Sequence, residues 1–252
     1  MSKFCVFAAA ALLFPVVAQA ADVQAVLAVP RQRIETADYR VSGRVVRIDA
    51  KGGRTSYGIT IKAHWFADVL RVVVEVASPQ EARAHILLEM RPSGQTVVRI
   101  AHPGDKAVMT VPVDKWSDTL FGPGFSYEDF LEPEIYWPGQ TLLEQTKYGA
   151  RECDVVKSTP AGSDRTRYSE VRTWLDHSIG FPVYVEKTQK GAGTVRQFTY
   201  IGLRKEAGVW SASQIEGKVR GQAGSTLLII ERGSAKANLK VDDFSNEHLT
   251  RF

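Results

Sequence analysis

Strict alternation of apolar and polar residues, repeated in one segment after another, is the feature that most restricts the fold of this sequence. In the stretch "TSYGITIKA" (55–63), Tyr57, Ile59 and Ile61 share one face, and polar residues occupy the other. The same period recurs in four neighbouring segments, 39–46, 70–76, 84–90 and 96–100. Since successive side chains of a strand point to opposite faces, the pattern predicts an antiparallel meander with one apolar face.

A second series of strand-like segments fills the later part of the chain. The candidates are 140–148, 151–158, 167–175, 181–189, 194–203, 209–220 and 225–232. Turn sequences such as "PAGSD" and "KGAG" separate them, and short helices are expected near 23–35 and in the closing "DDFSNEHLTRF". The prediction is a mainly β chain with small helices, built as one large, strongly curved antiparallel sheet. Because all-β domains of roughly 200–250 residues are common, we expect residues 21–252 to form a single domain.

The segment "GPGFSYEDFLEPEIYWPG" interrupts the strand pattern with aromatic and acidic residues. Ser126 and Asp129 have the spacing of a capping box, and Phe125 and Phe130 have the spacing of a hydrophobic staple. These signals predict a two-turn helix over 126–132.

Two further signals bear on this insert. Pro133 is expected to end the helix, because the residue before a proline avoids the α region, and "DKWSDTLFG" (114–122) predicts another short helix. Helices placed between two halves of a sheet must bury their apolar side against its concave face. They either complete the core or form a lid over a partly empty, lipid-sized hollow.

The first residues, "MSKFCVFAAAALLFPVVAQA", have the three parts of a secretory signal peptide. The apolar part is too short to span a bilayer, so we expect residues 1–20 to be cleaved and the mature protein to begin at Ala21. Cys5 precedes the apolar part, so it cannot be a lipid-modified cysteine at the cleavage point. Cys153 then has no intramolecular partner. The expectation is a soluble, exported protein without a lipid anchor, periplasmic in a Gram-negative cell.

Charge and motifs argue against nucleic acid and against catalysis. The 32 Lys and Arg residues against 28 Asp and Glu are scattered rather than gathered into a stripe. The histidines lack a metal-ligand spacing such as H-E-x-x-H, and no G-x-S-x-G elbow is present. Helix capping and solvation explain the carboxylates of the insert, which are Glu128, Asp129, Glu132 and Glu134. We therefore expect no catalytic residue, no metal and no cofactor.

Several motifs, in their order and spacing, carry a family resemblance. They are "GFSYEDFLEPE", then "RECDVV", then "EVRTWLDHSIGFPVYVEKTQKGAGTVRQFTYIGLRKEAGVW", and the closing "NLKVDDFSNEHLTRF". Together they resemble the outer-membrane lipoprotein-sorting branch of the LolA/LolB-like superfamily. The resemblance covers most of 38–252 and is most specific over 124–252.

The resemblance implies a curved, incompletely closed antiparallel half-barrel whose concave face is covered by a helical plug or lid. It also implies a soluble periplasmic carrier that binds acyl chains of a lipoprotein or lipid and shuttles them toward the outer membrane. The implied partners are an inner-membrane transporter and an outer-membrane acceptor. The superfamily's best-known carrier relies on a basic residue on an early strand, and Arg40, Arg44 and Arg47 all remain candidates for that role.

The carrier interpretation needs an apolar lining rather than a catalytic constellation. The expected cavity residues are Tyr57, Ile59, Ile61, Leu70, Val72, Val74, Ile86, Leu88, Met90, Val98, Ile100 and Met109. The expected lid residues are Phe125, Tyr127, Phe130 and Trp137. Two alternatives remain open, a periplasmic hydrophobic-ligand-binding accessory protein of an efflux-type (RND-like) transporter and a structural module whose hollow is filled by its own side chains.

Overall fold

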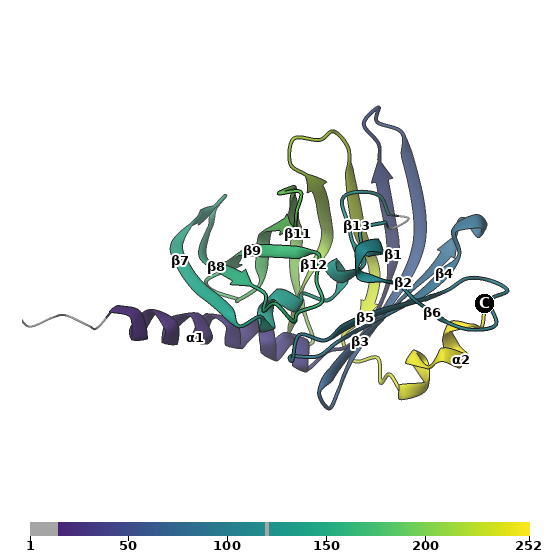
Figure 1. The fold of residues 1–252 in the computed structure, drawn as a ribbon, viewed down its shortest axis with the longest axis horizontal. Coiled ribbons are helices and arrows are strands. Elements are labelled where there is room, and N and C mark those ends of the chain that lie inside the picture. Colours follow the sequence, from purple (N-terminus) through teal and green to yellow (C-terminus); the bar gives the residue numbers. More distant parts are fainter. Residues whose placement is uncertain (1–14, 119–120) are drawn as a thin grey trace, which may run out of the picture.

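The computed structural model describes residues 15–118 and 121–252 of the chain (Figure 1). The predicted signal peptide, residues 1–20, lies for the most part outside the described residues. Helix α1 (Pro15–Glu35) covers the helix expected near 23–35 and extends beyond it toward the N-terminus. Within the described residues, no helix has both the length and the hydrophobicity needed to cross a bilayer.

A single antiparallel sheet of 13 strands forms the body of the molecule, as the alternation of the sequence predicts. The first six strands are β1 (Asp38–Ile48), β2 (Arg54–Phe66), β3 (Val69–Ser78), β4 (Ala84–Met90), β5 (Thr96–Ala101) and β6 (Met109–Thr110). The next seven are β7 (Gly139–Tyr148), β8 (Arg151–Thr159), β9 (Tyr168–Asp176), β10 (Pro182–Gln189), β11 (Val195–Glu206), β12 (Val209–Val219) and β13 (Ser225–Ser234). Only the two-residue strand β6 has no counterpart among the predicted strands.

The order of the strands shows why the sequence is interrupted in its middle. Strand β1 pairs with β13, with Val45 opposite Leu228, so the two meanders join at the centre of the sheet. Strands β6 and β7 consequently lie at opposite edges. The insert, residues 111–138, carries the chain from one edge to the other inside the curve of the sheet (Figure 1).

The insert is less helical than predicted. Its described residues form three short 3-10 helices, η2 (Val113–Lys115), η3 (Tyr127–Phe130) and η4 (Pro133–Tyr136). The capping box of Ser126 and Asp129 is confirmed, but the predicted two-turn helix over 126–132 is wrong.

The reason lies at Glu132, which has a left-handed backbone (φ of 56°) and turns the chain between η3 and η4. Pro133 disfavours the α region for this residue, so the helix breaks before the second turn. Of the helix predicted over 114–122, only the start coincides with η2, and residues 119–120 are outside the described part.

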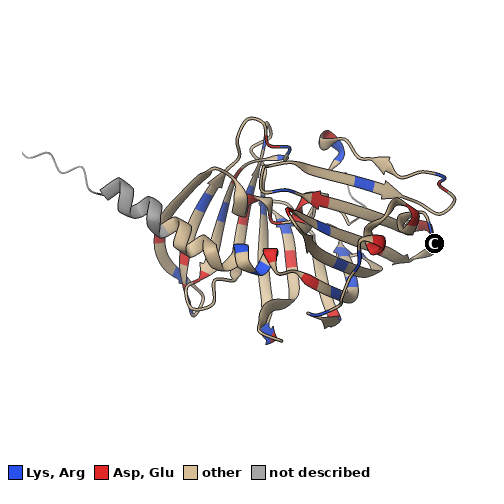
Figure 2. Cartoon of the chain, turned by 90° about the horizontal axis from the view of Figure 1, so that it is seen from below, with Lys and Arg blue, Asp and Glu red and all other residues tan. Residues whose placement is uncertain are grey.

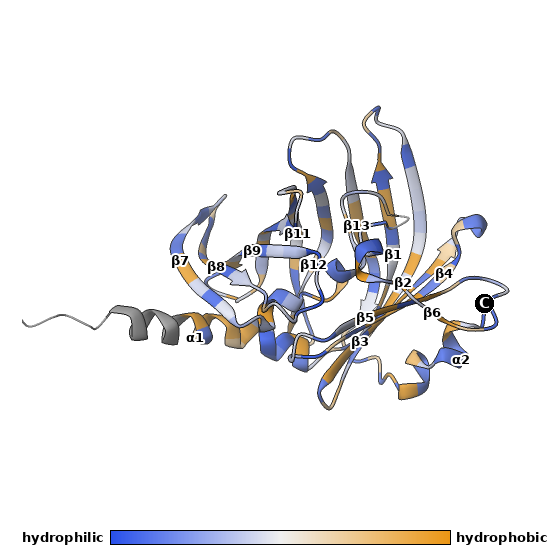
Figure 3. Cartoon of the chain, in the orientation of Figure 1, coloured by the Kyte–Doolittle hydropathy of each residue, from blue (hydrophilic) through white to orange (hydrophobic). Residues whose placement is uncertain are grey.

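Apolar side chains of the insert pack against the concave face of the first meander. Trp116, Phe121 and Leu131 are almost completely buried, and Phe121 meets the ring of Tyr57 edge-on at 6.0 Å. Figure 3 shows hydrophobic residues concentrated on the strands of this half. The insert therefore completes a solid core over β2–β5.

The end of the chain covers part of the opposite, convex face. The 3-10 helix η5 (Val241–Phe244) and helix α2 (Asn246–Leu249) form the short closing helix expected from the sequence. Phe244 and Leu249 lie in a second, smaller core together with Val73 of β3. The convex face is thus closed over β3 and β4, and the concave face is the side on which a large ligand has room.

Candidate functional site

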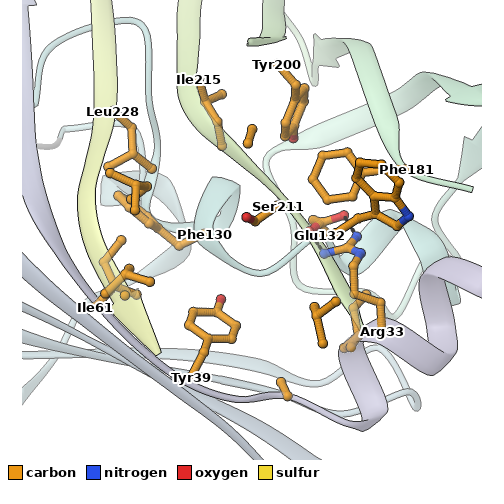
Figure 4. Close-up of a pocket in the computed structure, with 18 of the residues that line it drawn as sticks. Arg33, Tyr39, Ile61, Phe130, Glu132, Phe181, Tyr200, Ser211, Ile215 and Leu228 are labelled. Atoms are coloured by element: carbon orange, nitrogen blue, oxygen red, sulfur yellow. Dashed lines mark hydrogen bonds and ion pairs between the residues drawn. The ribbon is translucent and has the colours of Figure 1, made fainter. Parts of the chain in front are cut away.

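A hollow of about 210 Å³ remains on the concave face, beside the part that the insert fills. Its walls come from the C-terminal end of α1, from β1–β3, from the insert and from β10–β13. Figure 4 shows Ile61, Phe130, Ile215 and Leu228 around one end of the hollow and Phe181 near the other. Most of the lining is hydrocarbon, so the hollow is suited to an apolar guest.

The structure places four of the predicted site residues at this hollow. Ile61 and Leu70 line it from the sheet, and Phe125 and Phe130 line it from the insert. Phe125 and Phe130 lie 5.8 Å apart between ring centroids, as the staple predicts. The hollow therefore forms where the insert meets the seam of the sheet.

The other predicted site residues lie elsewhere. Nine expected cavity residues belong to the packed core instead, namely Tyr57, Ile59, Val72, Val74, Ile86, Leu88, Met90, Val98 and Ile100. Met109 is 53% exposed on the edge strand β6. Of the expected lid residues, Tyr127 and Trp137 are buried in the core and do not line the hollow. In this conformation these residues do not line or cover the hollow, and their role as lining or lid residues remains a prediction.

Sequence reasoning missed the wall contributed by the second meander. Phe198 of β11, Ile215 of β12 and Leu228 of β13 all line the hollow. Their segments alternate as clearly as those of the first meander, and this signal could have added them to the expected lining.

The three candidate early-strand arginines lie away from the hollow. Arg40 and Arg44 alternate along β1 with inward-facing residues and are exposed. Arg47 lies next to Gly122 of the insert. None of the three lines the hollow. The arginines that do line it are Arg33 from α1 and the exposed Arg204 from β11.

Three of the four carboxylates expected to be capped or solvated, those of Glu128, Asp129 and Glu134, have buried side chains, which corrects that expectation. Asp129 does cap, because it accepts the backbone N–H of Ser126 at 2.6 Å. It also accepts a hydrogen bond from the hydroxyl of Tyr168 at 2.9 Å and lies 3.6 Å from the guanidinium of Arg196. Charged groups interspersed along the sheet are visible in Figure 2.

Lys187 of β10 is the centre of this cluster. Its ammonium lies 3.3 Å from Asp129 and 3.0 Å from Glu134, and all three side chains are at most 4% exposed. Burial alone would lower the pKa of Lys187, but the carboxylates of Glu134 and Asp129 outweigh burial and raise it well above its ordinary value. The lysine is therefore charged and binds the insert to the second meander.

Arg33 holds the insert from the other side. Two of its nitrogens pair with both carboxylate oxygens of Glu132, at 2.7 and 3.0 Å, the two-point geometry that arginine favours with carboxylates. Its guanidinium also lies 5.0 Å from the ring centroid of Phe181. Because Glu132 sits at the turn between η3 and η4, α1 and β10 together fix the segment that places Phe130 at the hollow.

Glu128 is fully buried and has no cation within ion-pairing distance among the described residues. Its two oxygens accept hydrogen bonds from the hydroxyl of Thr166 at 2.6 Å and from the backbone N–H of Arg167 at 2.9 Å. Burial nevertheless raises the pKa of Glu128 to about 7. Ionisation of this carboxyl is thus a cost to the folded state near neutral pH.

Glu128→Gln is expected to change how stability depends on pH. The pKa of Glu128 is about 7 in the folded protein against 4.5 ordinarily, so between these values the folded protein holds more protons than the unfolded chain. The free energy of unfolding therefore falls as pH rises from about 4.5 to about 7, by ~3 kcal/mol for this group alone. The glutamine variant should lack this contribution when urea unfolding is measured across the window.

The control for this experiment is the exposed Glu81→Gln. The difference in the free energy of unfolding between Glu81→Gln and the wild type should stay constant over the same pH range. If the Glu128→Gln difference is equally constant, the folded-state pKa of Glu128 is ordinary and its burial has no energetic consequence.

Comparison with known proteins places this architecture. A family model described only as "Uncharacterized protein" matches residues 70–251. No curated protein matches the chain.

Several solved structures are similar over most of the chain. A domain from Vibrio parahaemolyticus, provisionally described as an outer membrane lipoprotein-sorting protein domain, has 18% identity and a TM-score of 0.80, covering 91% of this chain and 100% of its own. A DUF1329 family protein from Desulfovibrio piger has 15% identity and a TM-score of 0.80, and the match covers 90% of this chain and 98% of its own. A LolA superfamily protein from Nitrosomonas europaea has 14% identity and a TM-score of 0.67, and the match covers 90% of this chain and 99% of its own. The predicted LolA/LolB-like fold is thereby confirmed.

Proposed function

We propose that this chain, which belongs to the family of uncharacterized proteins whose model matches residues 70–251 and which has the LolA-superfamily fold, is a carrier of acyl chains. The observation that carries the proposal is the apolar hollow on the concave face, left open beside a core that is otherwise solidly packed. A structural module would fill this space with its own side chains. A carrier leaves it for the hydrocarbon of a guest.

The energetics of such binding are favourable without any catalytic group. Each methylene removed from water contributes about 0.8 kcal/mol, so four or five buried methylenes give roughly millimolar affinity before the costs of association. The hollow, about 210 Å³, is below the roughly 300–1,000 Å³ of drug-sized sites. It therefore suits part of a single chain, and a longer guest must displace Phe130 and its neighbours in the insert.

The signal-like first residues and the fold support a setting for this activity. We propose a soluble periplasmic protein that receives a lipidated protein or a lipid at the inner membrane and delivers it toward the outer membrane. A membrane transporter and an outer-membrane acceptor are the partners that this route requires.

The proposal is tested on the protein purified from its native compartment. Native mass spectrometry followed by lipid extraction should find an acyl-bearing species bound at one copy per chain. A protein that is consistently free of lipid, and that also fails to take up an added acyl chain, contradicts the carrier function.

A further inference from the structure

Two tyrosine hydroxyls face the hollow and have no hydrogen-bond partner among the residues that the structure describes. Tyr39 on β1 and Tyr200 on β11 line it, and their hydroxyls point inward from opposite sides (Figure 4). Within the described part of the chain, neither hydroxyl forms a hydrogen bond. Burial raises the pKa of Tyr39 to about 12 and raises that of Tyr200 as well. Both phenols therefore keep their protons at neutral pH and can donate.

A third donor belongs to Arg33. Its Nε is buried and has no acceptor among the described residues, while its other two nitrogens are occupied by Glu132. A buried donor without an acceptor costs free energy. Because this nitrogen is itself buried, the hydroxyls of Tyr39 and Tyr200 are the unpaired donors that a guest in the hollow can reach.

The buried charges at the hollow, in contrast, are already balanced, whereas Arg204 and Glu206, which also line it, are exposed. Arg33 is paired with Glu132, and Lys187 with Asp129 and Glu134. Bringing a further ionised group in beside these buried pairs would cost desolvation, and the buried cations there are already paired. An uncharged acceptor meets no such cost and satisfies the unpaired donors.

We propose that the group bound beside Tyr39 and Tyr200 is an uncharged carbonyl, that of an acyl ester or acyl amide, with its hydrocarbon chain among Ile61, Phe130 and Leu228. This inference rests on the proposed carrier function and adds the polar class of the cargo. Each hydroxyl donates to a carbonyl oxygen, and the chain attached to that carbonyl occupies the apolar end of the hollow. An alkane would fill the same space but leave the donors unsatisfied.

The experiment compares three ligands by displacement of a fluorescent apolar probe at pH 8. They are tridecane, which has no acceptor, methyl laurate, which has an uncharged one, and laurate, which is ionised. The wild type should bind methyl laurate more tightly than the other two. Tyr39→Phe and Tyr200→Phe should each weaken methyl laurate roughly three- to tenfold and leave tridecane unchanged. Tyr148→Phe, on a tyrosine outside the hollow, is the matched control and should change neither.

The outcomes separate this inference from the function on which it depends. If the wild type binds neither tridecane nor methyl laurate, the carrier function fails. If it binds both equally and the two phenylalanine variants behave like the control, the carrier function stands and the carbonyl site is overturned. Tightest binding of laurate would overturn the requirement for an uncharged group. A repeat with monolaurin and an N-lauroyl peptide distinguishes a free lipid from a lipidated polypeptide as the source of the carbonyl.

Discussion

Lys187→Met is expected to lower the free energy of unfolding by about 3–5 kcal/mol, the usual cost of removing one partner from a buried ion pair. The ammonium of Lys187 is the nearest cation to two buried carboxylates, Asp129 at 3.3 Å and Glu134 at 3.0 Å. Methionine matches the length of lysine but leaves both acids without this cation. Urea unfolding of the variant and the wild type at one pH measures the loss.

The matched control is Lys147→Met. Lys147 pairs with Glu152 at 3.3 Å, but both side chains are more than half exposed, and such pairs contribute at most about 1 kcal/mol. Adding Glu134→Gln to Lys187→Met should restore part of the lost stability, since one stranded charge is removed. A Lys187→Met loss as small as that of the control would contradict the view that ion pairs fasten the insert to the sheet.

Ser211→Trp is expected to weaken binding of an acyl chain by roughly a hundredfold. Ser211 lies on β12 and lines the hollow (Figure 4), so an indole at this position takes the space of the guest. Excluding about four methylenes, at ~0.8 kcal/mol each, amounts to ~3 kcal/mol. Displacement of a fluorescent acyl probe measures the loss, and urea unfolding shows whether the variant is folded.

Ser56→Trp supplies the control, because Ser56 is an exposed strand residue that does not line the hollow. It should bind the probe as the wild type does. Equal binding by a folded Ser211→Trp protein would place the acyl site elsewhere on the molecule.

The strands were predictable because their cause is local. Burying one face of a sheet imposes a period of two on each strand, and β2, with Tyr57, Ile59 and Ile61 on the buried face, shows it directly. The fold class followed from the repetition of this pattern and from the resemblance. The pairing of β1 with β13 could not be predicted in this way, because these two strands lie near opposite ends of the chain.

The insert shows where local reasoning fails. Its capping box was predictable from residues three apart, but the burial of Glu134 depends on Lys187, which is 53 positions further along. A carboxylate on a short polar segment is usually solvated, and only the tertiary structure shows that this one is paired. Acidic residues occur here because the sheet and α1 present cations toward the concave face.

The position of the hollow was unpredictable for a related reason. Alternation identifies the residues that face the concave side, but it does not tell which of them the insert covers. Trp116 and Phe121 fill the space over the first meander, and the remaining room lies at the seam with β11–β13. The position of the hollow is thus determined by how much of the concave face the aromatic side chains of the insert cover.

The central claim is that this remaining room is reserved for the hydrocarbon of a guest. A crystal of the protein grown with the methyl ester of a terminally brominated fatty acid tests it, because anomalous scattering locates the bromine without interpretation of weak density. The bromine is predicted to lie among Ile61, Phe130 and Leu228. A bromine found only on the outer surface, or none at all in a crystal saturated with the ester, would contradict the account.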